Sequence, residues 1–297
     1  MTHVATLVSN PGASALNDAV LARACGMLRE AQPSWLAPGI AADVRFTPDP
    51  PLHERTLAER LRSELGPQHI DVVVQRCAHR RKRLLVADMD STMIGQECLD
   101  ELADKINLRS RIAAITERAM SGEIAFEPAL RERVALLRGL PIEIVDEVLA
   151  DRIRANPGAR ALVHTMRAHG AYTCLVSGGF TLFTDRVAAM IGFHENRANR
   201  LIVETGRIEG VEEPILGRDA KLAALCELAA KLGLAREATL AVGDGANDLA
   251  MLQAAGLGVA YRAKPKVAAA AHARIDHGDL TALLYSQGYR REEFVGE

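Results

Sequence analysis

The most informative stretch of this 297-residue chain lies at positions 84–92 and reads LLVADMDST. Its first four residues are apolar, which is typical of a short strand that is buried on both faces. Two acids, Asp88 and Asp90, follow where the chain leaves this strand. One carboxylate can attack an electrophile such as phosphorus, and a second carboxyl group beside it can transfer protons. The same residues also suit a plain turn, because Asp, Ser and Thr all favour turns.

Three further apolar runs continue this pattern toward the C-terminus. Ala171–Val176 ends at Ser177-Gly178-Gly179, Thr239–Val242 ends at Gly243-Asp244-Gly245, and Leu257–Ala260 follows. Helical spacing separates the runs. Buried strands that alternate with helices predict an α/β fold, a doubly wound parallel sheet covered on both faces. Ligands bind such sheets beyond the carboxyl ends of the strands, which is where the polar clusters lie.

A long insertion separates the first two of these strands. The segment between Thr92 and Pro157 is much longer than one crossover helix requires. Helical patterns recur in it at Ile106–Met120, Pro128–Leu137 and Ile142–Arg154. We therefore expect an inserted helical cap at about 95–155, over the strand ends. Further along, Glu204-Thr205-Gly206 lies between two short strand patterns and predicts a hairpin.

Residues 1–80 have a different pattern and predict a small α+β domain ahead of the domain at 81–297. Strand patterns occur at Val4–Val8, Ile40–Phe46 and Ile70–Val74, and helical patterns at Asn17–Arg29 and Glu54–Leu65. This short alternation of strands and helices is independent of the longer one that follows.

The composition restricts the class of protein. Hydrophobic residues make up 48% and charged residues 25%, an ordinary balance for a folded soluble domain, and the formal net charge of -2 offers no basic field for nucleic acid. We find no signal-peptide pattern and no apolar run of about 18 residues, so we expect no membrane span. The five cysteines include no CxxC pair, which favours a reducing, cytoplasmic setting over a disulfide framework or a zinc site.

The remaining polar clusters suit phosphate chemistry. Ser177 and the amide groups after it can form an anion cradle. Lys221 opens a helix and can neutralise phosphoryl oxygens. Asp244 can supply a carboxylate to magnesium opposite Asp88, and Asp248 can orient a metal-bound water or a lysine. Taken singly, each cluster has a plain alternative: a glycine-rich strand exit, a solvated lysine, or an aspartate that caps a helix.

Together and in this order, the clusters resemble the signatures of the haloacid dehalogenase-like phosphatases: DxDx[TV], a strand-end Ser or Thr, a Lys, and GDxxxD. The matching residues are Asp88 to Thr92, Ser177, Lys221, and Gly243 to Asp248. The resemblance implies a Mg²⁺-dependent phosphatase that forms an aspartyl-phosphate. Asp88 is then the nucleophile and Asp90 the acid and base. The implied Mg²⁺ ligands are Asp88, the backbone carbonyl of Asp90, and Asp244, with Asp248 behind them.

Within that superfamily, residues from about 82 to 285 are similar to the phosphoserine phosphatases. The similarity rests on the first motif followed by Glu97, on Met120-Ser121-Gly122 with Phe126 and Arg133, on Val176 to Phe180, and on Gly243 to Leu252. It implies hydrolysis of O-phospho-L-serine to L-serine and phosphate, the last step of serine biosynthesis.

The same similarity implies roles for the substrate-binding residues. The glutamate at the position of Glu97 faces the substrate ammonium, and the arginine at the position of Arg133 clamps the carboxylate. Met120 and Phe126 wall the pocket, while Asn247, Lys221 and the amides at Ser177 and Gly178 hold phosphate and substrate. Individually, Glu97 and Arg133 also suit solvated helix charges, and Met120 and Phe126 suit core packing.

Residues 1–80 resemble an ACT-type regulatory module, in which four strands accompany two helices. Binding of a regulatory amino acid, dimerisation into a homodimer and simple packing are the roles that this resemblance leaves open. Two other functions stay open for the chain as a whole. One is a related phosphatase or phosphotransferase that acts on another small phosphate monoester. The other is an amino-acid-binding regulator with a vestigial site, which the intact acids of the motifs disfavour.

Overall fold

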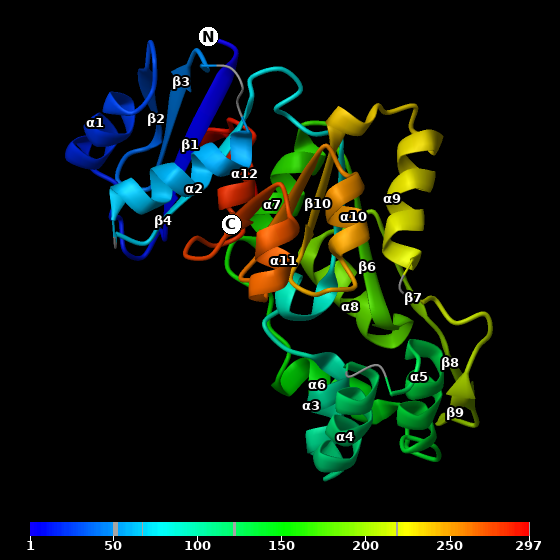
Figure 1. Cartoon of the computed structure of the whole chain (residues 1–297). Helices are drawn as coiled ribbons and strands as arrows, with labels where there is room; N and C mark the ends of the chain where they lie inside the picture. Colours follow the sequence, from blue (N-terminus) through cyan, green and yellow to red (C-terminus); the bar gives the residue numbers. More distant parts are fainter. Residues whose placement is uncertain (50–52, 67, 121–122, 218, 297) are drawn as a thin grey trace.

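The structure, a computed structural model, describes residues 1–49, 53–66, 68–120, 123–217 and 219–296, without the side chain of Met120. They form a small N-terminal sheet, a larger central sheet, a hairpin and the helices around them (Figure 1). None of the helices in these ranges combines the length and the apolar character needed to cross a membrane.

The N-terminal sheet is antiparallel, with the strand order β2-β3-β1-β4. Its elements are β1 (His3–Ser9), α1 (Asp18–Gly26), β2 (Gln32–Ala37), β3 (Ala41–Phe46), α2 (Glu54–Leu65) and β4 (Ile70–Arg76). Helix α1 begins where predicted, because Asn17 Oδ1 accepts a hydrogen bond from the Val20 N–H at 3.0 Å. Strand β2 was not predicted. It is an edge strand whose first three residues are exposed, so it lacks a buried apolar pattern.

The central sheet is parallel, with the strand order β12-β11-β10-β5-β6-β7. Its strands are β5 (Leu84–Ala87), β6 (Tyr172–Phe180), β7 (Glu195–Asn199), β10 (Thr239–Gly243), β11 (Leu257–Tyr261) and β12 (Ala273–Ile275). Four of them match the predicted apolar runs. The other two, β7 and β12, are the edge strands: β7 is polar, and β12 has three residues.

Helices cover both faces of this sheet. They are α7 (Ala159–Ala168), α8 (Thr181–Ile191), α9 (Ala220–Lys231), α10 (Leu249–Ala254), α11 (Pro265–Ala270) and α12 (Ala282–Ser286), with 3₁₀ turns at Arg236–Ala238 and Arg291–Glu293. Strand β5 shows the two layers, because Leu85 and Ala87 pack in one apolar core and Leu84 and Val86 in another. The predicted doubly wound α/β fold is therefore confirmed.

Four of the helices between β5 and β6, those that precede α7, form a lobe below the central sheet (Figure 1). They are α3 (Cys98–Lys105), α4 (Arg109–Met120), α5 (Phe126–Ala135) and α6 (Glu143–Asp151). The predicted hairpin, β8 (Leu201–Glu204) and β9 (Arg207–Val211), joins this lobe, since Arg207 pairs with Pro141 and Arg131 forms an ion pair with Glu213 at 2.7 Å. We call the four helices the cap.

The N-terminal sheet packs directly against the central part of the molecule. Val8 and Val73 belong to the same apolar core as Leu283 and Tyr285 near the C-terminus. In Figure 1, α12 lies beside β1, and it also contacts β3. Because one core contains residues of both parts, the domain boundary expected after residue 80 stays a prediction.

Candidate active site

The predicted catalytic residues meet at the carboxyl ends of three adjacent strands. Asp88 follows β5, Ser177 lies near the end of β6, and Asp244 follows β10; β5 pairs with β6 on one side and β10 on the other. The turn after β5 is a π-helical turn at Met89–Met93, interrupted at Asp90 and at Ser91, whose φ is 55°. This turn keeps Asp88 and Asp90 at the same end of the sheet. Their side chains contact different groups there.

Lys221 connects two of the aspartates. Its Nζ lies 2.5 Å from Asp88 Oδ1 and 2.6 Å from Asp248 Oδ1. Burial raises the pKa of Asp88, and the ammonium of Lys221 opposes that shift. Burial by itself lowers the pKa of Lys221, but the two carboxylates raise it above its ordinary value. A charged lysine between two carboxylates is therefore built into the end of the sheet.

Both carboxylate oxygens of Asp248 accept hydrogen bonds from neighbouring groups. Its Oδ2 accepts hydrogen bonds from the N–H groups of Asp244 at 3.1 Å and Gly245 at 2.9 Å. Residue 243 is glycine because a Cβ there would lie 2.4 Å from Asp248 Cγ. The close approach of backbone and carboxylate explains why this loop contains glycine.

The acidic cluster fits a hard divalent cation. Carboxylate oxygens of Asp88, Asp244 and Asp248 all lie within 4.8 Å of one another, and oxygen is the ligand that Mg²⁺ prefers. Asp248 already accepts from Lys221 and two amides, whereas Asp244 has one side-chain partner, the Thr92 hydroxyl at 3.1 Å from Oδ1. Asp88 and Asp244 therefore have the freer carboxylates.

The carboxyl group of Asp90 points away from this cluster. Its Oδ1 accepts from the Cys98 N–H at 2.8 Å and its Oδ2 from the Ser177 hydroxyl at 3.2 Å. Burial raises its pKa, which favours the protonated acid. Ser177 Oγ in turn accepts from the Gly179 N–H at 2.9 Å. Asp90 and Ser177 thus form a second, separate polar pair beside Asp88.

Two charged residues of the cap region lie at the same end of the sheet. Glu97 stands just before α3, and Ser91 donates to its Oε1 at 2.6 Å. Burial, followed by repulsion from Asp90, raises the pKa of Glu97 to about 7. The guanidinium of Arg133, on α5, is half-buried; burial lowers its pKa, and the charges of Asp100 and Glu97 oppose this. Its Nε donates to Ala129 O at 3.3 Å, and the fork has no carboxylate partner among the described residues.

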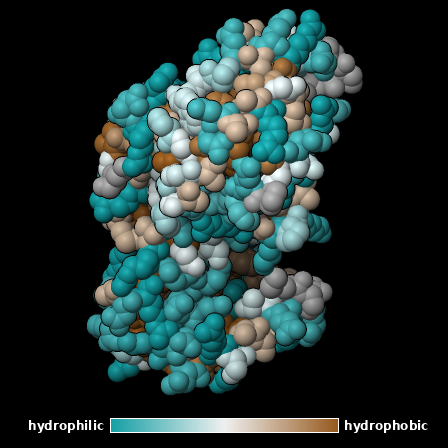
Figure 2. All heavy atoms as spheres, turned by 90° about the vertical axis from the view of Figure 1, so that its left-hand side faces the viewer, coloured by the Kyte–Doolittle hydropathy of each residue, from teal (hydrophilic) through white to brown (hydrophobic). Residues whose placement is uncertain are grey.

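The remaining predicted residues lie on either side of the opening between cap and sheet. Phe126 packs against Gly178, where a Cβ would lie 3.4 Å from Phe126 Cζ. Asn247 is exposed in the loop before α10. The backbone of Met120 ends α4, but its side chain, Ser121 and Gly122 lie outside the described residues. Figure 2 shows a recess between the lower lobe and the rest of the molecule.

Two contributors to this geometry were missed by the sequence analysis. Thr92 was assigned no role beyond its place in the motif, yet its hydroxyl orients Asp244. Asn199, at the end of the unpredicted strand β7, donates to Gly178 O at 3.0 Å and accepts from the Leu216 N–H at 2.7 Å. A lone asparagine in a polar strand has no pattern that distinguishes it from a surface residue.

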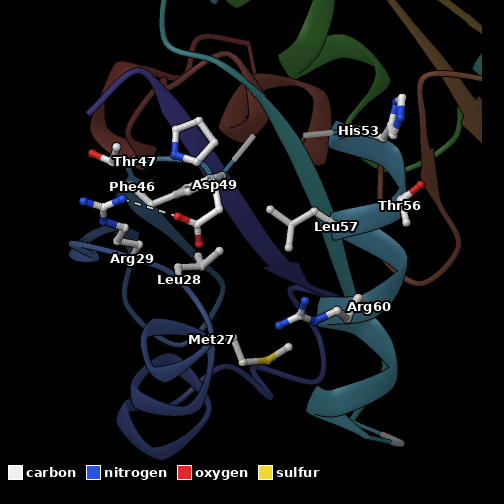
Figure 3. Close-up of a pocket in the computed structure, with 11 residues that line it drawn as sticks. Met27, Leu28, Arg29, Phe46, Thr47, Asp49, His53, Thr56, Leu57 and Arg60 are labelled. Atoms are coloured by element: carbon white, nitrogen blue, oxygen red, sulfur yellow. Dashed lines mark hydrogen bonds and ion pairs between the residues drawn. The ribbon is translucent and has the colours of Figure 1, made fainter. Parts of the chain in front are cut away.

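Two other features of the N-terminal part do not belong to this site. A pocket of about 240 Å³ lies between α1, the end of β3 and α2, and two of its lining residues, Arg29 and Asp49, form an ion pair (Figure 3). None of the predicted site residues lines it. A second acidic group contains Asp71, Asp276 and His277. The Asp71 carboxylate already accepts N–H groups of residues 276, 277 and 278, so it holds the two parts of the molecule together.

Comparison with known proteins finds hydrolases that are similar to this chain. A family model described as haloacid dehalogenase-like hydrolase matches residues 85–253. The chain is 45% identical over 208 residues to the phosphoserine phosphatase of Polaromonas sp., covering 68% of this chain and 88% of that relative.

Two solved structures extend the comparison. A haloacid dehalogenase family hydrolase from Salmonella enterica serovar Typhi matches with a TM-score of 0.84 and 27% identity, over 96% of this chain and 97% of that one. The structure titled as a phospho-aspartyl intermediate analogue of phosphoserine phosphatase matches with a TM-score of 0.63 and 38% identity, over 69% of this chain and 98% of that one. The Salmonella match therefore includes nearly the whole chain.

Proposed function

This chain belongs to the haloacid dehalogenase-like hydrolases, and on that basis we propose that it hydrolyses O-phospho-L-serine to L-serine and phosphate. The observation that carries the proposal is the division of roles between two neighbouring acids. Asp88 pairs with the ammonium group of Lys221, whereas Asp90 accepts hydrogen bonds from the Cys98 N–H and the Ser177 hydroxyl. Two carboxyl groups in environments this different suit a nucleophile and a proton donor.

In the first step of the proposed reaction, a carboxylate oxygen of Asp88 attacks phosphorus in line with the ester bond. The bond between phosphorus and the serine oxygen breaks, and Asp90 gives its proton to that oxygen. The products of this step are serine and an aspartyl-phosphate on Asp88. A structure with a phospho-aspartyl intermediate analogue of a phosphoserine phosphatase resembles this chain, which supports the assignment.

In the second step, Asp90 is the base. It takes a proton from a water molecule, whose oxygen attacks phosphorus and releases Asp88. We propose that the Lys221 ammonium and the Ser177 hydroxyl, which contact Asp88 and Asp90, stabilise the charge that the phosphoryl oxygens carry in a loose transition state. Asp248 keeps Lys221 in place, since its second oxygen is fixed by two amides.

We propose Mg²⁺ as the cation, held by Asp88, the backbone carbonyl of Asp90 and Asp244. When bound, Mg²⁺ supplies positive charge that reduces repulsion between the phosphate and the attacking carboxylate. The acidic cluster supports this assignment because its donors are oxygen atoms. The side chain of Asp90 already has two hydrogen-bond donors, which leaves its backbone carbonyl as the group to bind metal.

Substrate recognition is proposed to come from the cap. Glu97 is placed to face the ammonium group of phosphoserine, and Arg133, whose fork has no carboxylate partner among the described residues, to clamp its carboxylate. Phe126 and Met120 then shield the pocket from water. Gly178, which lies against Phe126, and the exposed Asn247 are proposed to contact phosphate and serine.

Phosphate release from L-phosphoserine, with Mg²⁺ and with EDTA, tests the proposal. Phosphothreonine and a phosphosugar are the comparison substrates. We expect Mg²⁺-dependent release that is selective for phosphoserine. Release from the comparison substrates alone would keep the aspartyl-phosphate chemistry and reject the roles of Glu97 and Arg133. Binding of an amino acid without any release would favour a regulatory protein with a vestigial site. A homodimer through the N-terminal part and a cytoplasmic location stay predictions.

A further inference from the structure

The two connections between the cap and the sheet lie side by side. The outgoing connection, residues 93–96, follows the turn after β5, and the return connection, residues 154–156, precedes α7. The Asn156 N–H donates to Met93 O at 2.9 Å, and the Gly95 N–H donates to Arg154 O at 3.3 Å. Ile94 and Ala155 form an antiparallel bridge between them. We call these paired connections the hinge.

The side chain of Asn156 links this hinge to the acidic cluster. Its Nδ2 donates to Thr92 O at 2.8 Å, and the Thr92 hydroxyl donates to Asp244 Oδ1 at 3.1 Å. Thr92 is fully buried. The backbone of Asn156 is itself fixed to the sheet part, because its carbonyl accepts from the Ala159 N–H, at the start of α7, at 3.0 Å. Two hydrogen bonds therefore lead from the return connection to a carboxylate of the cluster.

From this chain of contacts we propose that Asn156 is a positioning residue for the metal-binding edge of the site. Its amide holds the Thr92 carbonyl, and this fixes the peptide plane from which the Thr92 side chain extends. The hydroxyl then keeps the Asp244 carboxylate turned toward Asp88. The inference rests on the proposed function, since it takes Asp244 as a Mg²⁺ ligand.

A side chain without an amide donor at position 156 cannot hydrogen-bond to the Thr92 carbonyl. The Thr92 carbonyl then lacks one hydrogen bond in a buried position, and the peptide unit is free to rotate. Partners that orient metal ligands typically change metal affinity by about 10- to 100-fold when they are removed. Asn156 contacts Thr92 and not Asp244 itself, so we expect its removal to change the Mg²⁺ affinity by a smaller factor.

Gln96 provides a matched control in the same hinge. Its Oε1 accepts from the Arg154 N–H at 3.0 Å, so Gln96→Ala also removes one side-chain hydrogen bond between the two connections. Among the described residues, the side chain of Gln96 forms no hydrogen bond with Thr92 or Asp244. The control therefore loosens the hinge without disturbing the chain of contacts to the acidic cluster.

The experiment measures Mg²⁺ binding to the full chain without substrate, as the rise of the melting temperature with Mg²⁺ concentration. We expect Asn156→Ala to raise the apparent Kd for Mg²⁺ obtained from this rise by about 3- to 10-fold, and Gln96→Ala to change it by less than about 2-fold. In a Thr92→Val background, Asn156→Ala should add almost nothing, because its effect passes through the Thr92 hydroxyl. The second variant is Asn156→Asp, whose side chain has the same shape as asparagine but lacks the amide donor.

Each outcome has a defined meaning. Equal weakening by Asn156→Ala and Gln96→Ala, or additive weakening in the Thr92→Val background, overturns the inference in favour of general loosening of the hinge. Asp244→Asn separates the two proposals. If Asp244→Asn abolishes the Mg²⁺-dependent rise while Asn156→Ala and Asn156→Asp leave it unchanged, the metal site stands and the role of Asn156 is wrong. If Asp244→Asn leaves the rise intact, the proposed metal site itself is wrong.

Discussion

The Nζ of Lys221 lies 2.5 Å from Asp88 Oδ1, and the side chains of the two residues are only 5% and 8% exposed. An ion pair this deeply buried costs desolvation energy, so the charge of Asp88 depends on the ammonium of Lys221. That ammonium opposes the rise in the pKa of Asp88 that burial causes, and a phosphate oxygen can also approach it. This relationship makes Asp88 the better nucleophile of the two acids and leads to the first prediction.

Asp88→Asn should abolish phosphoserine hydrolysis, with a loss of at least about 10³-fold, because an amide cannot form the acyl phosphate. The variant should still fold, since Asp248 continues to pair with Lys221. Phosphate release and the melting temperature check both points. Asp151→Asn, at an exposed carboxylate of the cap, is the control. Wild-type rates in Asp88→Asn would mean that another group attacks phosphorus.

Asp90→Asn should slow both chemical steps, but unequally for different leaving groups. With phosphoserine, we expect a loss of about 10²- to 10⁴-fold, because the serine oxygen needs the proton of Asp90. With p-nitrophenyl phosphate, whose leaving group needs no proton, the first step should survive and the second should stall. Rapid-mixing kinetics should then show a burst of nitrophenol equal to the enzyme concentration. Absence of that burst, with equal losses on both substrates, speaks against the acid and base role.

Arg133→Lys and Glu97→Gln should weaken the recognition of different groups of the substrate, the carboxylate and the ammonium. Lysine cannot reproduce the two-pronged contact of a guanidinium with a carboxylate, so Arg133→Lys should raise KM for phosphoserine by about 10-fold. It should leave KM for phosphoethanolamine, which has no carboxylate, nearly unchanged. Glu97→Gln should raise KM for phosphoserine and for phosphoethanolamine. It should leave KM for 3-phosphooxypropanoate, which has no ammonium group, nearly unchanged. Steady-state kinetics on the three compounds tests the pattern, and uniform effects on all three would contradict it.

The buried lysine Lys82, far from the site, should make stability depend on pH. Its Nζ donates to Glu237 O at 2.7 Å, and burial lowers its pKa from 10.5 to about 8, opposed by the charge of Glu237. Between these values the unfolded chain binds more protons than the folded chain, so the free energy of unfolding should rise with pH. From pH 7.5 to 10, wild type should gain about 2 kcal/mol relative to Lys82→Met. Urea unfolding at several pH values measures this difference, and parallel curves would disprove it.

Asp43→Ala should destabilise the protein strongly, because Asp43 is the buried partner of Arg80. Both Arg80 Nη atoms lie 2.6 Å from the carboxylate, and the two side chains are 11% and 4% exposed. Removing one partner leaves an unpaired buried charge, at a cost of about 3–5 kcal/mol. The matched control is Arg29→Ala, which breaks an exposed pair with Asp49 and should cost less than about 1 kcal/mol. Denaturant unfolding compares the two, and equal costs would contradict the role of burial.

Much of the fold could be predicted from the sequence because its signals are local. Continuous apolar runs predicted the four inner strands of the central sheet, and helical spacing predicted α1, α2 and three of the four cap helices. These signals failed at β2, β7 and β12, which are edge strands and bury too little surface to need an apolar pattern. Helix α3 was missed as well, since the predicted cap helices began at Ile106.

Some features of the site could also be predicted from local sequence signals, and others could not. The sequence by itself determined which acids, lysine and serine are available and that they follow strand ends, because parallel strands bring their carboxyl ends to one edge. Only the tertiary structure decided that Lys221 joins Asp88 to Asp248, and that Asp90 turns toward Ser177 instead of the acidic cluster. These contacts join segments far apart in the chain. Their geometry depends on how the strands, helices and cap pack, and no pattern of neighbouring residues contains that information.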